Sequence, residues 1–336
     1  MPTNPTPPTT KKAWKRFASL SLQMVLFALI LYMIWGRLDK AWEQIASKEF
    51  RFAISWNWLL VGGIAYALAL PFPASYWFCV LRGLGQPAGY YSTLRAHIVG
   101  HLGKYIPGKI FVVLIRSGLI AGRGISPAVG VISIFLEGLM QMATGALVFA
   151  ALLVVYSIRI EDNPYALWLA LLLMGGIAFA LSPPVFRWGV RFVGMKKFSQ
   201  DAEKLEQLSW KTYLLAIPWM LSYWLFLGIS YWCVIRGIGV AVAPSVYPVC
   251  VAAIAGSMVA GFVLIFAPGG LGVRESLIVL LTTSMFAQST NTPEAAALVS
   301  AAALRIVWIV VEMILAVLFF VIRPSESVPS SEVSSI

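Results

Sequence analysis

Two segments of the chain combine a proline–glycine pair with basic side chains, a pattern that could bind an anion. The first, residues 103–109, reads GKYIPGK and places Lys104 and Lys109 on either side of the pair. Proline removes a backbone donor and glycine permits positive φ, so we expect a helix to break here and to restart near Gly108. The restarted helix would point free amides and a positive dipole end at its ligand, which favours a phosphate. Arg116 follows and adds a further cation.

The second segment, residues 267–275, reads APGGLGVRE and repeats this arrangement. Gly269 and Gly270 follow its proline, and Arg274 and Glu275 come shortly after. A single segment of this kind is explained equally well by a kinked helix whose basic side chains extend to the membrane surface. The presence of two related copies favours a binding site.

Ionisable residues at membrane depth are the next candidates. Glu137 lies ten residues after Pro127, or about 15 Å along a helix, and Arg305 lies twelve residues after Pro293. Glu312 follows Arg305 by seven residues and therefore shares its helix face. Charged side chains are costly in a bilayer, so we expect all three to be functional or paired. An ion pair between Glu137 and Arg305 is one such arrangement, and it could act as a gate.

No motif in the sequence indicates catalysis or a cofactor. His97 and His101 are four residues apart, but Ile98 stands where a zinc protease has its glutamate. We therefore expect solvated histidines on a half-helix rather than a metal site. Neither GxxxxGK[ST] nor GxSxG occurs, and we expect no enzyme activity and no cofactor.

The composition is that of a membrane protein. Of the 336 residues, 60% are apolar and 12% are charged, and the mean hydropathy is +0.83, whereas about a quarter of the residues in a soluble domain are charged. Runs long enough to span a bilayer lie at 17–36, 58–81, 125–158, 164–186, 212–235 and 295–322, and the run 237–273 is interrupted by proline and glycine. The sequence predicts an all-α, polytopic membrane protein with about six full spans plus two Pro-Gly-broken re-entrant hairpins, or with eight or more spans.

An internal repeat relates the two halves of the chain. Residues 79–85 read CVLRGLG and residues 233–239 read CVIRGIG. Each is followed, in the same order, by a Pro-Gly pair, an arginine and a proline that opens a long helix. We therefore predict repeat one over 58–158 and repeat two over 212–322.

The distribution of lysine and arginine sets the expected orientation. The basic cluster at 11–16 places the N-terminus in the cytoplasm, and six basic residues without an acid over 82–123 mark a further cytoplasmic segment. Arg82 and Arg236 then fall on opposite sides, so the repeats are inverted, as in transporters that alternate access to a midplane site. The net charge of +11 follows from this pattern, and we expect no nucleic-acid binding.

These observations predict a single transmembrane domain over residues 17–323. Residues 1–16 are expected to be a disordered basic N-terminus, and residues 324–336 a disordered C-terminal tail. No small-residue cleavage site follows the basic cluster, so we expect the first span to be retained. The expected location is the cell (inner, cytoplasmic) membrane, with several spans and both termini in the cytoplasm.

The two Pro-Gly segments resemble the motifs of a known family. Residues 104–109 (KYIPGK) and 268–275 (PGGLGVRE) are similar to the signatures of the lysylphosphatidylglycerol synthase transmembrane-region family. The helix with Glu137 and the helix with Arg305 and Glu312 take the places of its charged helices. The resemblance covers most of the chain and implies a flippase-like domain. Because the sequence lacks the soluble aminoacyl-transferase domain of the full-length synthases, we expect that it does not itself make lysylphosphatidylglycerol.

Together, the residues and the resemblance predict a lipid flippase for an anionic phospholipid, an aminoacyl-phospholipid or a polyprenyl-linked glycolipid. The Pro-Gly segments would bind the headgroup phosphate, and Glu137, Glu275 and Glu312 would receive its cationic or hydroxylated part. A proton-coupled secondary transporter of a small anion and a non-transporting scaffold for a lipid-modifying enzyme are the alternatives. The expected partner is a membrane lipid with a phosphate-bearing headgroup, and a homo-oligomer is compatible with the sequence.

Overall fold

Every secondary-structure element in the part of the chain that the structure describes is a helix. The structure is a computed structural model and describes residues 42–43, 53–105, 110–121, 124–156, 168, 172, 175–176, 179, 184–185, 210–263 and 272–322. The predicted span 17–36, most of the predicted span 164–186, and both predicted disordered ends, 1–16 and 324–336, lie outside the described residues. Within them, the all-α prediction is confirmed.

The first repeat contains two helices in line, a broken pair of short helices and one long helix. These are α2 (Trp56–Ala69), α3 (Pro71–Gly83), α4 (Tyr90–Gly100), the 3-10 helix η1 (His101–Tyr105), α5 (Ile110–Ala121) and α6 (Pro127–Tyr156). Both α3 and α6 begin with a proline. The backbone amide at the first position of a helix has no partner within the helix, so its absence in proline costs nothing there. With 11 and 12 residues, α4 and α5 are each shorter than the roughly 20 residues that a span requires.

The second repeat has the same order of elements. It consists of α10 (Trp210–Gly237), η3 (Pro244–Val246), α11 (Tyr247–Val263), α12 (Val273–Phe286) and α13 (Pro293–Val321). The pair α11 and α12 takes the place of α4 and α5 around the second Pro-Gly segment, and α13 takes the place of α6. A re-entrant path for either pair stays a prediction, because α11 with η3 is itself long enough to cross a membrane.

Five candidate membrane spans are found within the described residues. They are Trp56–Gly83, Pro127–Leu153, Trp210–Gly237, Pro244–Phe262 and Pro293–Val321. Four of them coincide with the runs predicted at 58–81, 125–158, 212–235 and 295–322, and Pro244–Phe262 lies within the interrupted run. The protein is therefore a multi-pass membrane protein, as the composition predicts.

Matching turns end α3 and α10. Gly85 and Gly239 both have positive φ, +67° and +90°, a conformation that glycine adopts without steric cost. The amide of Gly85 donates to the carbonyl of Arg82 at 3.0 Å, and the amide of Gly239 donates to that of Arg236 at 3.1 Å. The heptapeptide repeat in the sequence is therefore a repeated turn in the structure.

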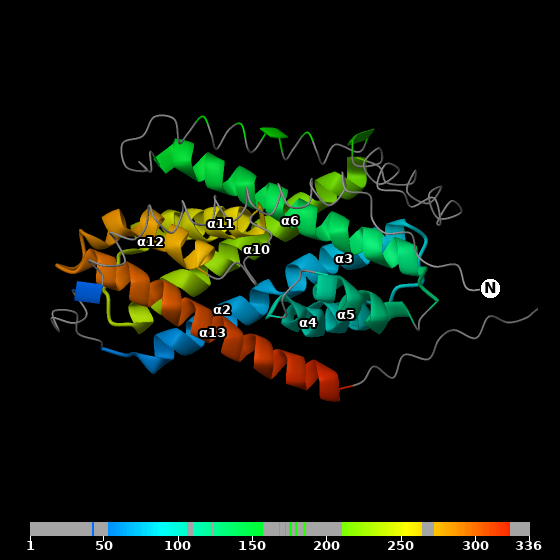
Figure 1. Cartoon of the computed structure of the whole chain (residues 1–336), viewed down its shortest axis with the longest axis horizontal. Helices are drawn as coiled ribbons and strands as arrows, with labels where there is room; N and C mark the ends of the chain where they lie inside the picture. Colours follow the sequence, from blue (N-terminus) through cyan, green and yellow to red (C-terminus); the bar gives the residue numbers. More distant parts are fainter. Residues whose placement is uncertain are drawn as a thin grey trace, which may run out of the picture.

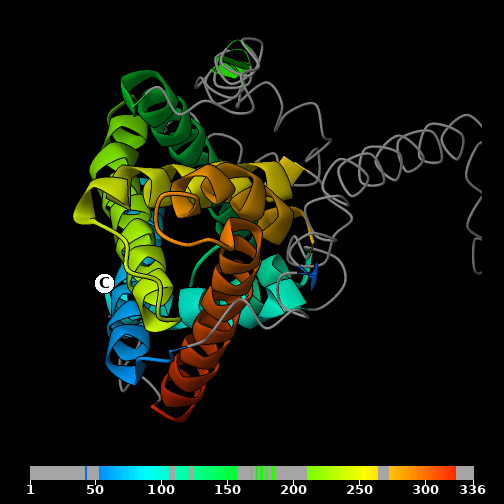
Figure 2. The same cartoon turned by 90° about the vertical axis from the view of Figure 1, so that its left-hand side faces the viewer.

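Corresponding helices of the two repeats run in opposite directions. The amide of Ser55, just before α2, donates to the carbonyl of Gly237 at the end of α10 at 2.9 Å. At the other end, Tyr76 of α3 packs in one cluster with Tyr213 from the start of α10. Figure 1 shows the same reversal for α6 and α13, which lie at opposite edges of the described bundle. Figure 2 shows this separation from a second side, with α10 and α11 in between. This is the arrangement that an inverted repeat requires.

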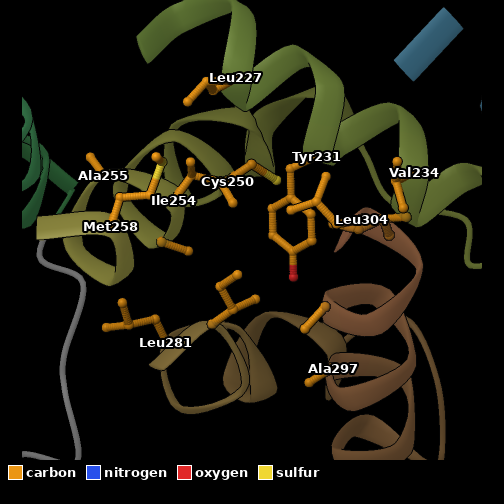
Figure 3. Close-up of a cluster of buried hydrophobic side chains, with 14 of the residues drawn as sticks. Leu227, Tyr231, Val234, Cys250, Ile254, Ala255, Met258, Leu281, Ala297 and Leu304 are labelled. Carbon is orange, nitrogen blue, oxygen red and sulfur yellow. The ribbon is translucent and has the colours of Figure 1, made fainter. Parts of the chain in front are cut away.

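A buried core joins α10 to the other helices of the second repeat (Figure 3). Its members include Leu227, Tyr231 and Val234 of α10, Cys250, Ile254 and Met258 of α11, Leu281 of α12, and Ala297 and Leu304 of α13. The Tyr231 hydroxyl shares a hydrogen bond with Ser300 Oγ at 3.0 Å. Transfer of an apolar side chain from lipid to the protein interior lowers its free energy only a little. Close packing and such hydrogen bonds therefore hold the helices together.

The two matching turns give a first testable prediction. An alanine at either glycine would adopt a left-handed conformation at a cost of about 1–2 kcal/mol. At Gly239 the added Cβ would also lie 2.9 Å from the carbonyl oxygen of Ala53, whereas nothing lies within 4 Å at Gly85. Gly239→Ala should therefore lower the melting temperature in detergent more than Gly85→Ala. Gly83→Ala, at an open position without positive φ, is the control. Equal losses for the two turn variants would contradict the packing of Gly239 against Ala53.

Candidate functional site

A cavity of about 630 Å³ lies between the two repeats. Repeat one contributes lining residues from α2, η1, α5 and α6, and repeat two contributes them from α10, α11, α12 and α13. The walls are mostly apolar, and the polar groups among them include Tyr66, His101, Lys104, Arg116, Glu137 and Arg274. Four of the residues predicted as a site, Lys104, Arg116, Glu137 and Arg274, are thus brought to one cavity.

Arg116 of α5 and Glu137 of α6 form a buried ion pair on this cavity. Arg116 Nη1 donates to Glu137 Oε2 at 2.7 Å, and both residues are almost fully buried. The guanidinium also lies over the ring of Trp77, 5.7 Å from its centroid. The pair ties the short helix α5 to the long helix α6 of the same repeat.

The two histidines lie beside this pair, and the expectation of a solvated position is wrong for His97. Its side chain is fully buried, because α4 packs against α3, α5 and α13. His97 Nδ1 is 3.8 Å from Glu137 Oε1, and neither ring nitrogen of His97 has a hydrogen-bond partner. His101 Nδ1 lies 3.4 Å from Arg116 Nη2. Among the described residues, no group of histidine, cysteine or carboxylate side chains could hold a metal ion.

Glu312 of α13 is a buried acceptor of three hydrogen bonds that cross from repeat one to repeat two. Its Oε1 accepts from the ammonium group of Lys104 and from the hydroxyl of Tyr66, and its Oε2 accepts from the hydroxyl of Tyr105 at 2.7 Å. The ring of Tyr66 stacks on Trp308, with 4.6 Å between ring centroids. Glu312 is only 1% exposed, and all three groups that donate to its carboxylate come from repeat one.

Arg305 of α13 pairs with Glu275 of α12. Arg305 Nη1 donates to Glu275 Oε1, and Glu275 Oε2 accepts from the amide of Gly272 at the start of the same helix, at 2.8 Å. The expected pair between Glu137 and Arg305 is therefore wrong, since each has another partner. The physical reason is that α6 and α13 lie at opposite edges of the bundle (Figure 1), so similar depth along the two helices does not bring the side chains together.

Arg274 has no ion pair with any described residue, and its Nε atom is buried without a hydrogen-bond partner. Its side chain passes over Gly261 of α11, where an added Cβ would lie 2.9 Å from Arg274 Cγ. Arg116 passes over Gly100 of α4 in the same way, and an added Cβ there would overlap its Cγ. Sequence reasoning missed these glycines, although each lies seven residues before the proline of a Pro-Gly pair.

The remaining predicted site residues lie outside the described residues. These are Gly108 and Lys109 of the first Pro-Gly segment and Gly269 and Gly270 of the second. The prediction that the glycines cradle a phosphate therefore stays a prediction. What the geometry provides is a cavity with paired charges from both repeats and one arginine without a described partner.

The fold and the site define a class of protein. It is a polytopic helical membrane protein with two matched halves and a charged cavity between them. The sequence matches the family described as "Lysylphosphatidylglycerol synthase TM region" over residues 18–316, and the chain belongs to this family. Among curated proteins, none matches the chain. The match confirms the family predicted from the sequence and relates the function of the protein to membrane lipids.

The site gives a second prediction, on stability. Replacing Glu312 by glutamine leaves Lys104 in a largely apolar site without its counter-charge, which should cost roughly 3 kcal/mol. Tyr66→Phe removes one hydrogen bond to the carboxylate and should cost about 1.5 kcal/mol. Lys104→Met combined with Glu312→Gln should destabilise less than the sum of the single changes, because the pair is lost together. Thermal unfolding of the purified variants measures this coupling, and strict additivity would contradict the interaction.

Proposed function

We propose that the protein moves a lipid with a phosphate-bearing headgroup between the two leaflets of a membrane. The observation that carries this proposal is the cavity between the repeats, which combines cationic groups with mostly apolar walls. An amphipathic ligand requires both features in one place. The family match, which relates the chain to a lipid synthase by name, supports the same class of ligand.

The apolar walls support a lipid rather than a small polar solute. Phe135 of α6 and Phe262 of α11 line the cavity and are also 54% and 37% exposed. Apolar side chains that are exposed on a membrane protein face lipid tails. A lipid could therefore keep its tails beside these phenylalanines while its headgroup occupies the cavity.

The cationic groups support an anionic headgroup. Arg116, Arg274 and Lys104 all line the cavity, and a guanidinium can bind two phosphate oxygens at once. The two arginines come from opposite repeats, so a headgroup could pass from one to the other as the repeats exchange roles. A binding site at the interface of the two repeats is also what an inverted-repeat transporter is expected to have.

The alternative of a proton-coupled transporter of a small anion draws support from the buried His97 and Glu137, which could exchange a proton. It leaves the volume of the cavity unexplained, because about 630 Å³ is the size of site that takes a drug-sized ligand. The lipid proposal accounts for both the volume and the charges. We further propose that the protein acts in the cytoplasmic membrane, with both termini in the cytoplasm, and that it translocates its lipid without modifying it.

Lipid transport in proteoliposomes tests the proposal. The purified chain is reconstituted with a fluorescent phosphatidylglycerol, and the fraction of label reduced by external dithionite reports exchange between leaflets. We expect faster exchange than in empty vesicles, and a loss of more than about tenfold for Arg116→Gln combined with Arg274→Gln, since two charge-assisted contacts to the phosphate are removed.

Lys211→Gln is the matched control, because Lys211 is an exposed cation at the start of α10 and does not line the cavity. It should transport at the rate of the unchanged protein. A rate for the double arginine variant equal to that of this control would exclude the arginines from headgroup binding. Exchange no faster than in empty vesicles would contradict the transport function itself.

A further inference from the structure

Arg116 and Arg274 occupy matching places in the two repeats. Each follows a Pro-Gly segment, passes over a glycine of the preceding helix, lines the cavity and has a buried Nε atom without a hydrogen-bond partner. They differ in one respect. Arg116 is paired with Glu137 at 2.7 Å, whereas Arg274 has no ion pair within the described part of the chain.

The other carboxylates near the cavity do not supply the missing partner. Glu312 accepts from Lys104, and Glu275 accepts from Arg305. A guanidinium in a mostly apolar cavity is costly without a negative group beside it. Among the described residues, the site is therefore short of one negative charge, and the shortage lies at Arg274.

The three carboxylates also differ in how firmly they are held. Both oxygens of Glu312 and both oxygens of Glu275 accept hydrogen bonds. Glu137 is held through Oε2 alone, since its Oε1 is buried without a hydrogen-bond partner and lies 3.8 Å from His97 Nδ1. A carboxylate bound through one oxygen leaves its partner at a lower cost than one bound through both. Glu137 is thus the carboxylate best suited to exchange with a ligand.

We propose that Arg274 binds a phosphate group in the conformation described here, while Glu137 occupies the equivalent position on Arg116 in place of a ligand. Glu137 is then an internal counter-ion that prevents Arg116 from binding a ligand, while Arg274 is available to bind one. The cavity consequently holds one phosphate at a time. The proposal rests on the proposed function for the source of that phosphate, a lipid headgroup, and adds to it an order of occupation.

Counting bound lipids on four forms of the full chain tests this inference. The delipidated protein in detergent is titrated with short-chain phosphatidylglycerol, and native mass spectrometry reports how many molecules remain bound. We expect one lipid on the unchanged protein and binding weaker by on the order of tenfold for Arg274→Gln. Glu137→Gln frees Arg116 and should give a second bound lipid.

The decisive form is the double variant, Arg274→Gln with Glu137→Gln. Removing the internal counter-ion should restore binding of one lipid, now at Arg116. A purely structural role for Glu137 predicts the opposite, a double variant that binds no better than Arg274→Gln, and that result would overturn the proposal. An unchanged lipid count for Glu137→Gln alone would overturn it as well. Glu43→Gln and Lys211→Gln, at exposed positions, control for the loss of charge.

Two further arms separate this inference from the proposed function. Short-chain diacylglycerol, which lacks the phosphate, should not bind with this pattern. If inorganic phosphate shows the pattern of loss and rescue but phosphatidylglycerol does not, the exchange between arginines is supported and the lipid function is contradicted. If the protein transports lipid but the double variant shows no rescue, only the inference fails.

Discussion

The cost of burying charge in an apolar bundle determines how this protein is held together. A lone ionised side chain is strongly unfavourable at membrane depth, so each carboxylate near the cavity has a cation beside it. In repeat one the cation is on the short helix α5 and the acid on the long helix α6, as Arg116 and Glu137. Repeat two reverses this order, with Glu275 on the shorter helix α12 and Arg305 on the long helix α13. Each pair fixes a shorter helix to the long helix of its own repeat, and Glu312 accepts hydrogen bonds from the other repeat.

The symmetry of the backbone is therefore not matched by the charges. Both repeats place an arginine over a glycine beside the same cavity, yet only one of the two arginines is neutralised by a described residue. If both arginines were neutralised in the same way, the two halves would not differ in their preference for an anion. Under the proposed function, this unequal pairing would give the two halves different affinities for an anion, and a carrier needs such a difference between its two orientations.

Much of the fold could be predicted from the sequence, because the relevant signals are local. Long apolar runs, prolines at the first position of α6 and α13, and the repeated heptapeptide predict spans, helix starts and turns. The sequence also indicates that Glu137, Arg305 and Glu312 need partners. It does not predict which ones, because the pairing depends on how the helices are arranged side by side and rotated. For the same reason, the depth of His97 could not be read from the composition of α4.

One feature of the helix packing limits how the repeats can move. Gly62 lets α2 approach α10 so closely that an added Cβ would lie 3.1 Å from the carbonyl oxygen of Ser230, and a backbone hydrogen bond joins Ser55 to Gly237 at the end of the contact. Separating the two helices would break this hydrogen bond and remove the close packing at Gly62. Helices α2 and α10 are thus held together, and under the proposed function a change of access would come from the other helices moving relative to this pair.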